Sequence, residues 1–148
     1  MSTSPKLLLN SLLFQDIAIG SAYSFERYID AALVESFAQI SGDYNPLHMD
    51  EAYCARTKFG GRIVHGMLLA SFFSALVGML CPGRGCLYLS QDIRFKKPLM
   101  LNQWTIVKGT VTAKSEATNM VVLATVITDK NGVILVEGEA KVQVQTVL

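Results

Sequence analysis

Residues 63–80 read IVHGMLLASFFSALVGML, and this apolar run decides the fold. Most of its positions are Ile, Val, Leu, Met, Phe or Ala, which predicts a helix buried on all sides. One face carries only small residues, spaced four apart: Gly66, Ala70, Ser74 and Gly78. Such a face lets a sheet or another helix approach the helix backbone closely.

The same run is almost long enough to cross a membrane, which takes about 20 apolar residues. Three polar side chains interrupt it, at His65, Ser71 and Ser74, and no basic clusters flank it. The strand-like sequence after it belongs in water. We therefore expect a buried helix that Pro82 and Gly83 end, and no membrane association.

The residues after the helix predict strands. Val, Ile, Thr and aromatic residues are enriched at 87–95, 104–112, 118–128 and 133–144. Residues 129–132, Asp-Lys-Asn-Gly, predict a hairpin turn because Asn and Gly tolerate positive φ. Consecutive strands after a central helix indicate an α+β fold in which an antiparallel sheet curls around that helix.

The residues before the helix combine a short strand-like segment at 22–28 with a helix that Asp30 caps and Gly42 ends. Its apolar positions follow a helical period: Leu33, Val34, Phe37 and Ile40. Pro46 then keeps residues 43–48 out of a helix, so their polar side chains lie on a fixed loop. Residues 49–57 look like a short helix.

Length and charge limit the possible functions. The chain has 148 residues, which predicts one domain over 1–148 with residues 1–9 as a loose N-terminal tail. Lys plus Arg number 13 and Asp plus Glu 12, so no basic surface for nucleic acid is expected. The large apolar share predicts a homo-oligomer.

Cysteine and histidine usage argues against a disulfide framework and a metal site. The three cysteines form no CxxC pair, and they are Cys54, Cys81 and Cys86. His48 and His65 would need acidic partners that the spacing does not suggest, so no metal is predicted. The opening residues lack a signal-peptide core and cleavage site, which predicts a cytoplasmic location.

Residues 37–48, FAQISGDYNPLH, resemble the signature of the MaoC-like, (R)-specific enoyl-CoA hydratases. The similarity continues through residues 59–60, 63–71, 82–85 and 95–98, and covers the chain from about residue 10 onward. It implies a single hot-dog domain, with a long central helix wrapped by an antiparallel sheet. The family is usually dimeric with active sites at the subunit interface. One departure is Leu101-Asn102 at a turn where the family often has Gly-Asp.

The resemblance implies reversible (R)-specific hydration of trans-2-enoyl-CoA to (3R)-hydroxyacyl-CoA in fatty acid metabolism, without a cofactor. This reaction needs a base for water, an acid for C2 and a donor to the thioester oxygen. By resemblance Asp43 and His48 activate the water together, and one of them protonates C2. The Gly66 amide is the expected oxyanion donor, since it lies near a helix N-terminus.

Further residues are assigned to substrate binding by the same resemblance: Asn45, Ser74 and Val77. Asn45 is expected to fix the loop or orient the catalytic pair, while Ser74 and Val77 are expected to line the acyl pocket. His65 is assigned to packing or to a structural hydrogen bond. The cationic residues that could contact the phosphates of coenzyme A are Arg62, Arg84, Arg94, Lys96 and Lys97.

Three other functions stay open at this level. The same chemistry run backward gives a (3R)-hydroxyacyl thioester dehydratase acting on acyl carrier protein. The hot-dog fold also hosts thioesterases, although the Asp-x-Asn-Pro-x-His motif argues against that chemistry. A non-catalytic acyl-binding subunit would be expected to have lost Asp43 or His48, and both are present.

Overall fold

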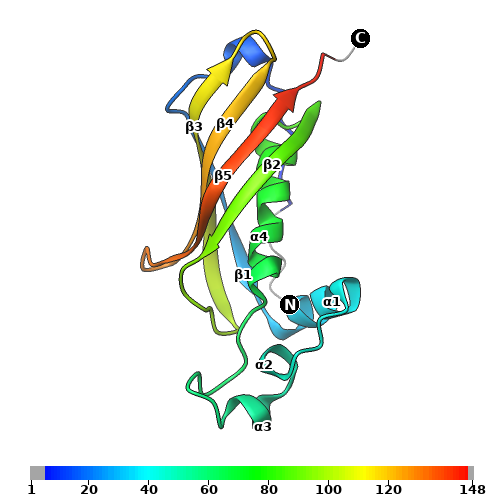
Figure 1. Cartoon of the computed structure of the whole chain (residues 1–148), viewed down its shortest axis with the longest axis vertical. Coiled ribbons are helices and arrows are strands. Elements are labelled where there is room, and N and C mark those ends of the chain that lie inside the picture. Colours follow the sequence, from blue (N-terminus) through cyan, green and yellow to red (C-terminus); the bar gives the residue numbers. More distant parts are fainter. Residues whose placement is uncertain (1–5, 147–148) are drawn as a thin grey trace.

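The computed structural model describes residues 6–146 and contains one five-stranded sheet (Figure 1). Its strands are β1 (Ala22–Ile29), β2 (Cys86–Phe95), β3 (Gln103–Ser115), β4 (Met120–Asp129) and β5 (Ile134–Val144). The order across the sheet is β1-β3-β4-β5-β2, and every neighbouring pair is antiparallel. The strands that the sequence predicts are therefore confirmed, with β3 longer than predicted at both ends and β4 beginning two residues later and ending one residue later than predicted. β1 and β2 form the two edges.

The main helix, α4 (Gly66–Ala75), lies along this sheet and continues into a π-helical turn at Leu76–Leu80 (Figure 1). The smaller helices gather near the beginning of α4, and they are α1 (Ala31–Ser41), α2 (Pro46–Met49) and α3 (Glu51–Cys54). A short 3₁₀ turn, η1 (Phe14–Asp16), precedes β1. This is the α+β, hot-dog arrangement predicted above.

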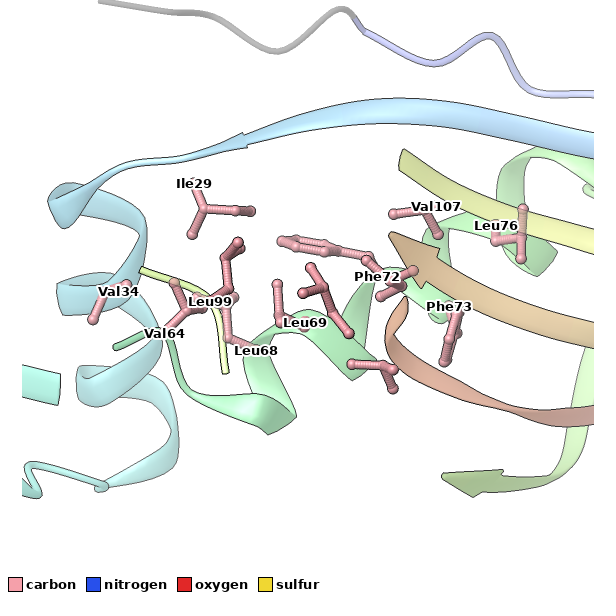
Figure 2. Close-up of a cluster of buried hydrophobic side chains, with 13 residues drawn as sticks. Ile29, Val34, Val64, Leu68, Leu69, Phe72, Phe73, Leu76, Leu99 and Val107 are labelled. Carbon is pink, nitrogen blue, oxygen red and sulfur yellow. The ribbon is translucent and has the colours of Figure 1, made fainter. Parts of the chain in front are cut away.

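The core forms where α4 meets the sheet. Phe73 and Leu76 are almost fully buried, and α4 side chains extend toward Ile29 of β1 and Val107 of β3 (Figure 2). Val34 of α1 and Leu99 complete this cluster at the N-terminal end of α4. Each fully buried aliphatic or aromatic side chain contributes about 1.5–3 kcal/mol relative to exposure. This packing fixes where α4 begins.

The central helix differs from the prediction in two respects. It begins at Gly66 rather than Ile63, because Ile63 bridges Met100 and the Val64 amide donates to the Leu99 carbonyl. Those pairings hold the chain extended before the first helical turn. The prediction that the helix is buried on all sides is also wrong, since Met67 is 56% exposed in the single chain.

The segment after α1 also differs from the prediction. Pro46 begins helix α2 instead of preventing a helix, because proline fits the first helical position, where no amide hydrogen bond is needed. The Asn45 side chain caps α2 by accepting from the Leu47 amide. His48 therefore lies on a helix, and the expected helix at 49–57 is reduced to α3, which Asp50 caps.

The predicted boundaries of α1 are confirmed. The Asp30 carboxylate accepts from the Leu33 amide, and Gly42 ends the helix in the left-handed conformation with φ of 79°. Ile40 does not join the core that its helical spacing predicts, because it is 85% exposed. At the departure from the family sequence, Asn102 supplies the turn with φ of 61°.

The N-terminal segment is partly held by the rest of the chain. Residues 1–5 lie outside the described part, so the predicted loose tail over 1–9 is described only from residue 6, without a helix or strand up to residue 10. The Asn10 amide donates to the Met79 carbonyl, and the Asn10 carbonyl accepts from the Arg84 amide. Within residues 6–146 no helix is long and apolar enough to cross a membrane.

Two glycines with positive φ allow a matched test of this N-terminal contact. Gly83 (φ 80°) and Gly132 (φ 81°) have nearly the same backbone conformation, but only at Gly83 would a Cβ strike the Asn10 carbonyl. We expect Gly132→Ala to lower the free energy of unfolding by about 1 kcal/mol. Gly83→Ala should cost about 1–3 kcal/mol more through the added clash. Denaturant unfolding measures both, and equal losses would contradict the clash.

Candidate active site

The Asp43 side chain lies on a tight turn between α1 and α2. Gly42 reverses the chain at the end of α1, and Asp43 Oδ1 accepts from the Asn45 amide at 3.1 Å. The Ser41 hydroxyl accepts from the Asp43 amide at 3.2 Å. These local bonds hold Oδ1 and leave Oδ2 directed at two histidines, 4.0 Å from His48 Nε2.

His48 has a defined tautomer. Its Nδ1 lies 2.8 Å from the Ile63 carbonyl oxygen, and because a carbonyl only accepts, Nδ1 carries the proton. The lone pair of the neutral ring is then on Nε2, which faces Asp43. The Arg62 side chain donates to the His48 carbonyl from the other side of the peptide. His48 is thus held in position to accept a proton at Nε2.

The gap between Asp43 Oδ2 and His48 Nε2 suits a bridging water. At 4.0 Å the two atoms are too far apart for a direct hydrogen bond. A water molecule about 2.8 Å from each would span this distance with a near right angle at its oxygen. The side chain of Asp43 is 48% exposed and that of His48 13%, so solvent reaches the pair from the Asp43 side.

His65, immediately before α4, completes the cluster. Its Nε2 lies 2.9 Å from the Asp43 backbone carbonyl and 3.9 Å from Asp43 Oδ2. Its ring packs against His48 with centroids 3.9 Å apart. Burial lowers the pKa of the His65 imidazole below its usual value of 6.5, with the nearby His48 and Arg62 acting in the same direction. Burial therefore favours the neutral form of His65 against the opposing effects of the Asp43 hydrogen bond and the Asp43 carboxylate.

The sequence spacing suggested no acidic partner for the histidines, and that interpretation was wrong. Ligand atoms of Asp43, His48 and His65 all lie within 4.8 Å of one another. However, the Asp43 carbonyl fixes the proton of His65 on Nε2, the ring nitrogen nearest the carboxylate. Only His48 then offers a lone pair toward Asp43, so the cluster is built as a hydrogen-bonded site rather than a three-ligand metal site.

A cavity of about 400 Å³ opens beside this cluster. Its polar lining is Asp43, His48, His65, Lys96 and Lys97, and most of the remainder is apolar, including Leu69, Phe95, Leu99, Leu135 and Val136. Gly66 also lines it as the first residue of α4. Among the hydrogen bonds of residues 6–146, none uses the Gly66 amide. The cavity therefore combines a titratable pair with a free helix N-terminal donor.

Comparison with known proteins agrees with this geometry. The family model described as the MaoC-like domain matches residues 15–132. The chain belongs to the MaoC-like domain family. It is 41% identical to the (R)-specific enoyl-CoA hydratase of Aeromonas caviae, over 87% of this chain and 96% of that protein. It is 36% identical to the 3-hydroxybutyryl-CoA dehydratase of Methylorubrum extorquens, over 92% of this chain and 86% of that protein.

A solved structure supports the same relationship for this MaoC-like chain. The unliganded R-hydratase of Pseudomonas aeruginosa superposes with a TM-score of 0.89 at 33% identity, over 96% of this chain and 90% of that one. The agreement covers almost every described element. The hot-dog fold and the family membership that the sequence motif predicts are therefore confirmed.

Of the predicted site residues, three line the same cavity of this MaoC-like chain: Asp43, His48 and Gly66. Asn45 is adjacent, with its side-chain oxygen used to cap α2. Ser74 lines a second cavity of about 390 Å³ along the outer face of α4. Val77 is 1% exposed and packs in the core with Ile17 and Cys81. The substrate-binding roles of Asn45, Ser74 and Val77 stay predictions.

The sequence argument missed two features of the site. The expectation that His65 makes a structural hydrogen bond is confirmed, but its partner, the Asp43 carbonyl, lies 22 residues away. The Ile63 carbonyl, which sets the His48 tautomer, lies 15 residues from its partner. Neither contact has a local sequence signal, because both depend on α4 meeting the α1–α2 turn.

Proposed function

We propose that this chain catalyses reversible, (R)-specific hydration of trans-2-enoyl-CoA to (3R)-hydroxyacyl-CoA. The observation that carries the proposal is the 4.0 Å gap between Asp43 Oδ2 and His48 Nε2, beside the free amide of Gly66 in one cavity. The relatives of known activity, at 41% and 36% identity over most of both chains, add support. Within this proposal, the chain acts as a hydro-lyase without a cofactor.

In the proposed reaction, Asp43 and His48 hold one water molecule. His48 Nε2 accepts a proton from the water as the water oxygen forms a bond to C3 of the enoyl group. Asp43 Oδ2 accepts the second hydrogen bond and fixes the direction of attack. The electrons of the C2–C3 double bond move toward the thioester oxygen, and C2 then takes a proton from the same pair. Addition from one side yields the R product.

The Gly66 amide is proposed to bind the thioester oxygen. Negative charge develops there as the enolate forms, and the first amides of a helix have no internal partner. The positive end of the α4 dipole adds to this stabilisation. A Cβ at this position would lie 2.9 Å from the Phe95 ring, so the absence of a side chain keeps the amide accessible. The accessible amide therefore stabilises the negative charge that the thioester oxygen carries only during the reaction.

We assign coenzyme A as the group that carries the acyl chain of the substrate. Lys96 and Lys97 line the cavity and can pair with phosphate oxygens. The two relatives named above carry CoA in their names. Acyl carrier protein as carrier is the second candidate, because the same two lysines could contact its acidic surface. The mainly apolar lining of the cavity suits the acyl chain in either case.

We further propose a homodimer formed through the β2 edge. This strand has no neighbour on one side within residues 6–146, and Leu87 and Leu89 on it are 48% and 50% exposed. Met67 on α4 lies beside the second cavity, which Ile93 of β2 also lines. A partner covering this face would bury apolar area and satisfy the edge. A cytoplasmic location stays a prediction from the sequence.

The first prediction concerns the water-activating pair. Asp43→Asn and His48→Gln should each lower kcat for crotonyl-CoA hydration by about 10²–10⁴-fold, because each variant removes a group that acts on the water. Loss of enoyl-thioester absorbance measures the rate, and chiral analysis identifies the product. Asp50→Asn is the matched control, since this N-cap carboxylate lies outside the cavity lining and asparagine also caps.

The outcomes discriminate between the candidate functions. Wild-type R product with both variants inactive and folded supports the proposal. Activity only on substrates attached to acyl carrier protein would show that the carrier is acyl carrier protein and not coenzyme A. Wild-type inactivity on every enoyl thioester, with hydrolysis of acyl-CoA instead, would point to a thioesterase.

The second prediction tests whether catalysis needs the Gly66 N–H itself or only the absence of a side chain at this position. Gly66→Ala adds a Cβ near Phe95 and keeps the N–H, whereas Gly66→Pro adds bulk and removes the N–H. Proline is tolerated at the first helical position, and the preceding His65 has φ of −56° and ψ of 127°, which proline accepts. We expect kcat to be about 10²–10³-fold lower for proline than for alanine. Equal rates in the two variants would exclude this amide as the donor.

The third prediction concerns assembly. Light scattering should give a mass twice the chain mass of 16.2 kDa. Leu89→Lys places a charge at the exposed β2 edge and should shift the protein toward monomer, whereas Ile19→Lys changes another exposed apolar residue away from that strand. A wild-type monomer at micromolar concentration, or dissociation by both variants alike, would contradict this interface.

A further inference from the structure

We infer that His65 is a positioning residue for the hydration step: its Nε2–H holds the Asp43 backbone while its ring supports His48. The inference rests on the proposed function and extends it to a residue with no direct role in proton transfer. His65 is 1% exposed, and it is the one fully buried histidine of the chain's two. Both members of the catalytic pair contact it.

The first contact fixes the Asp43 turn. His65 Nε2 donates to the Asp43 carbonyl at 2.9 Å, which ties the α1–α2 turn to the residue that precedes α4. Asp43 is otherwise held by bonds to its own neighbours, Ser41 and Asn45. Those local bonds shape the turn but do not set its distance from α4. The His65 bond does, so it sets the position of the carboxylate relative to the Gly66 amide.

The second contact supports the His48 ring. The His48 and His65 rings pack with centroids 3.9 Å apart and planes at 30°. Phe37 of α1 meets His65 edge-on with centroids 5.1 Å apart, so His65 is held between Phe37 and His48. The hydrogen bond from His48 Nδ1 to the Ile63 carbonyl fixes one side of the His48 ring. Contact with the His65 ring limits rotation of the His48 ring about this hydrogen bond. His48 Nε2 is thereby kept facing Asp43.

The surroundings of His65 favour its neutral form. The charged and titratable groups that face it are Asp43, His48 and Arg62. Burial disfavours its charged form, and a positive His65 would repel His48 as His48 takes the proton from water. His65 Nδ1, which carries the lone pair, is buried without a hydrogen-bond partner among the described residues, so no neighbour is placed to give a proton to it. The ring therefore acts as a fixed donor rather than a second base.

Two substitutions separate the donor from the ring. His65→Gln keeps an amide N–H near the position of Nε2 and loses the ring, whereas His65→Phe keeps a ring against His48 and loses the donor. We expect kcat for crotonyl-CoA to fall about 10–100-fold in His65→Phe, because displacement of catalytic groups lowers the rate by about this much. KM should change by less than about threefold. The kcat of His65→Gln should be at least about tenfold higher than that of His65→Phe. Val121→Ala, on β4 in the separate core cluster that contains Val77 and Cys81, controls for general destabilisation.

A second measurement does not depend on activity. With two histidines in the chain, imidazole nitrogen NMR resolves His48 once His48→Gln has identified the His65 signals. The Nδ1–H signal of His48 should be the same in the wild type and His65→Phe, which keeps a ring against His48, and altered in His65→Gln, which loses that ring. If the wild type hydrates no enoyl thioester, the proposed function fails, and this spectrum still tests the positioning role.

Three results would overturn the inference. One is equal kcat in His65→Phe and His65→Gln. Another is a loss of kcat that follows the melting temperature, with Val121→Ala affected to the same extent. The last is a His48 nitrogen spectrum that is identical in all three proteins. Recovery of kcat by glutamine, together with a His48 signal that is altered in the glutamine variant and unchanged in the phenylalanine variant, would establish the positioning role.

Discussion

The packing of α4 against the sheet is the constraint on which the rest of this protein depends. Phe73 and Leu76 are buried between the helix and the strands, so α4 cannot shift along its axis without opening the core. The N-terminus of α4 is therefore a fixed point. His65 and Gly66 stand at that point, one holding the Asp43 turn and the other presenting a free amide to the cavity.

The site is assembled from short local motifs joined by two long-range hydrogen bonds. Asx turns and N-caps shape residues 42–50, and they would form in many sequence contexts. The bonds from His48 to the Ile63 carbonyl and from His65 to the Asp43 carbonyl connect those motifs to α4. The outcome is a carboxylate and an imidazole separated by 4.0 Å, a distance that suits one shared water.

The exposed face of α4 and the free β2 edge indicate what a single chain leaves incomplete. Met67 lines both the cavity beside Asp43 and His48 and the second cavity, so the two are neighbours. Ser74 opens onto the second cavity rather than the first. In the proposed dimer, a partner covering β2 would also cover this second cavity, which Ile93 of β2 lines.

The sequence predicted a central helix, the strands, the Asp30 and Gly42 boundaries of α1, and Asp43, His48 and Gly66 as candidate site residues, which line one cavity. The helical spacing of apolar residues, the capping residues and the fixed motif are local signals, because each depends only on residues close together in the chain. Only the tertiary structure decided that Pro46 starts a helix, that Ile63 pairs with Met100, and that His65 meets Asp43. Those contacts join residues far apart in the chain, and packing of α4 rather than spacing sets their distances. For the same reason Val77 lies in the core and Ser74 outside the catalytic cavity, although one helical pattern contains both.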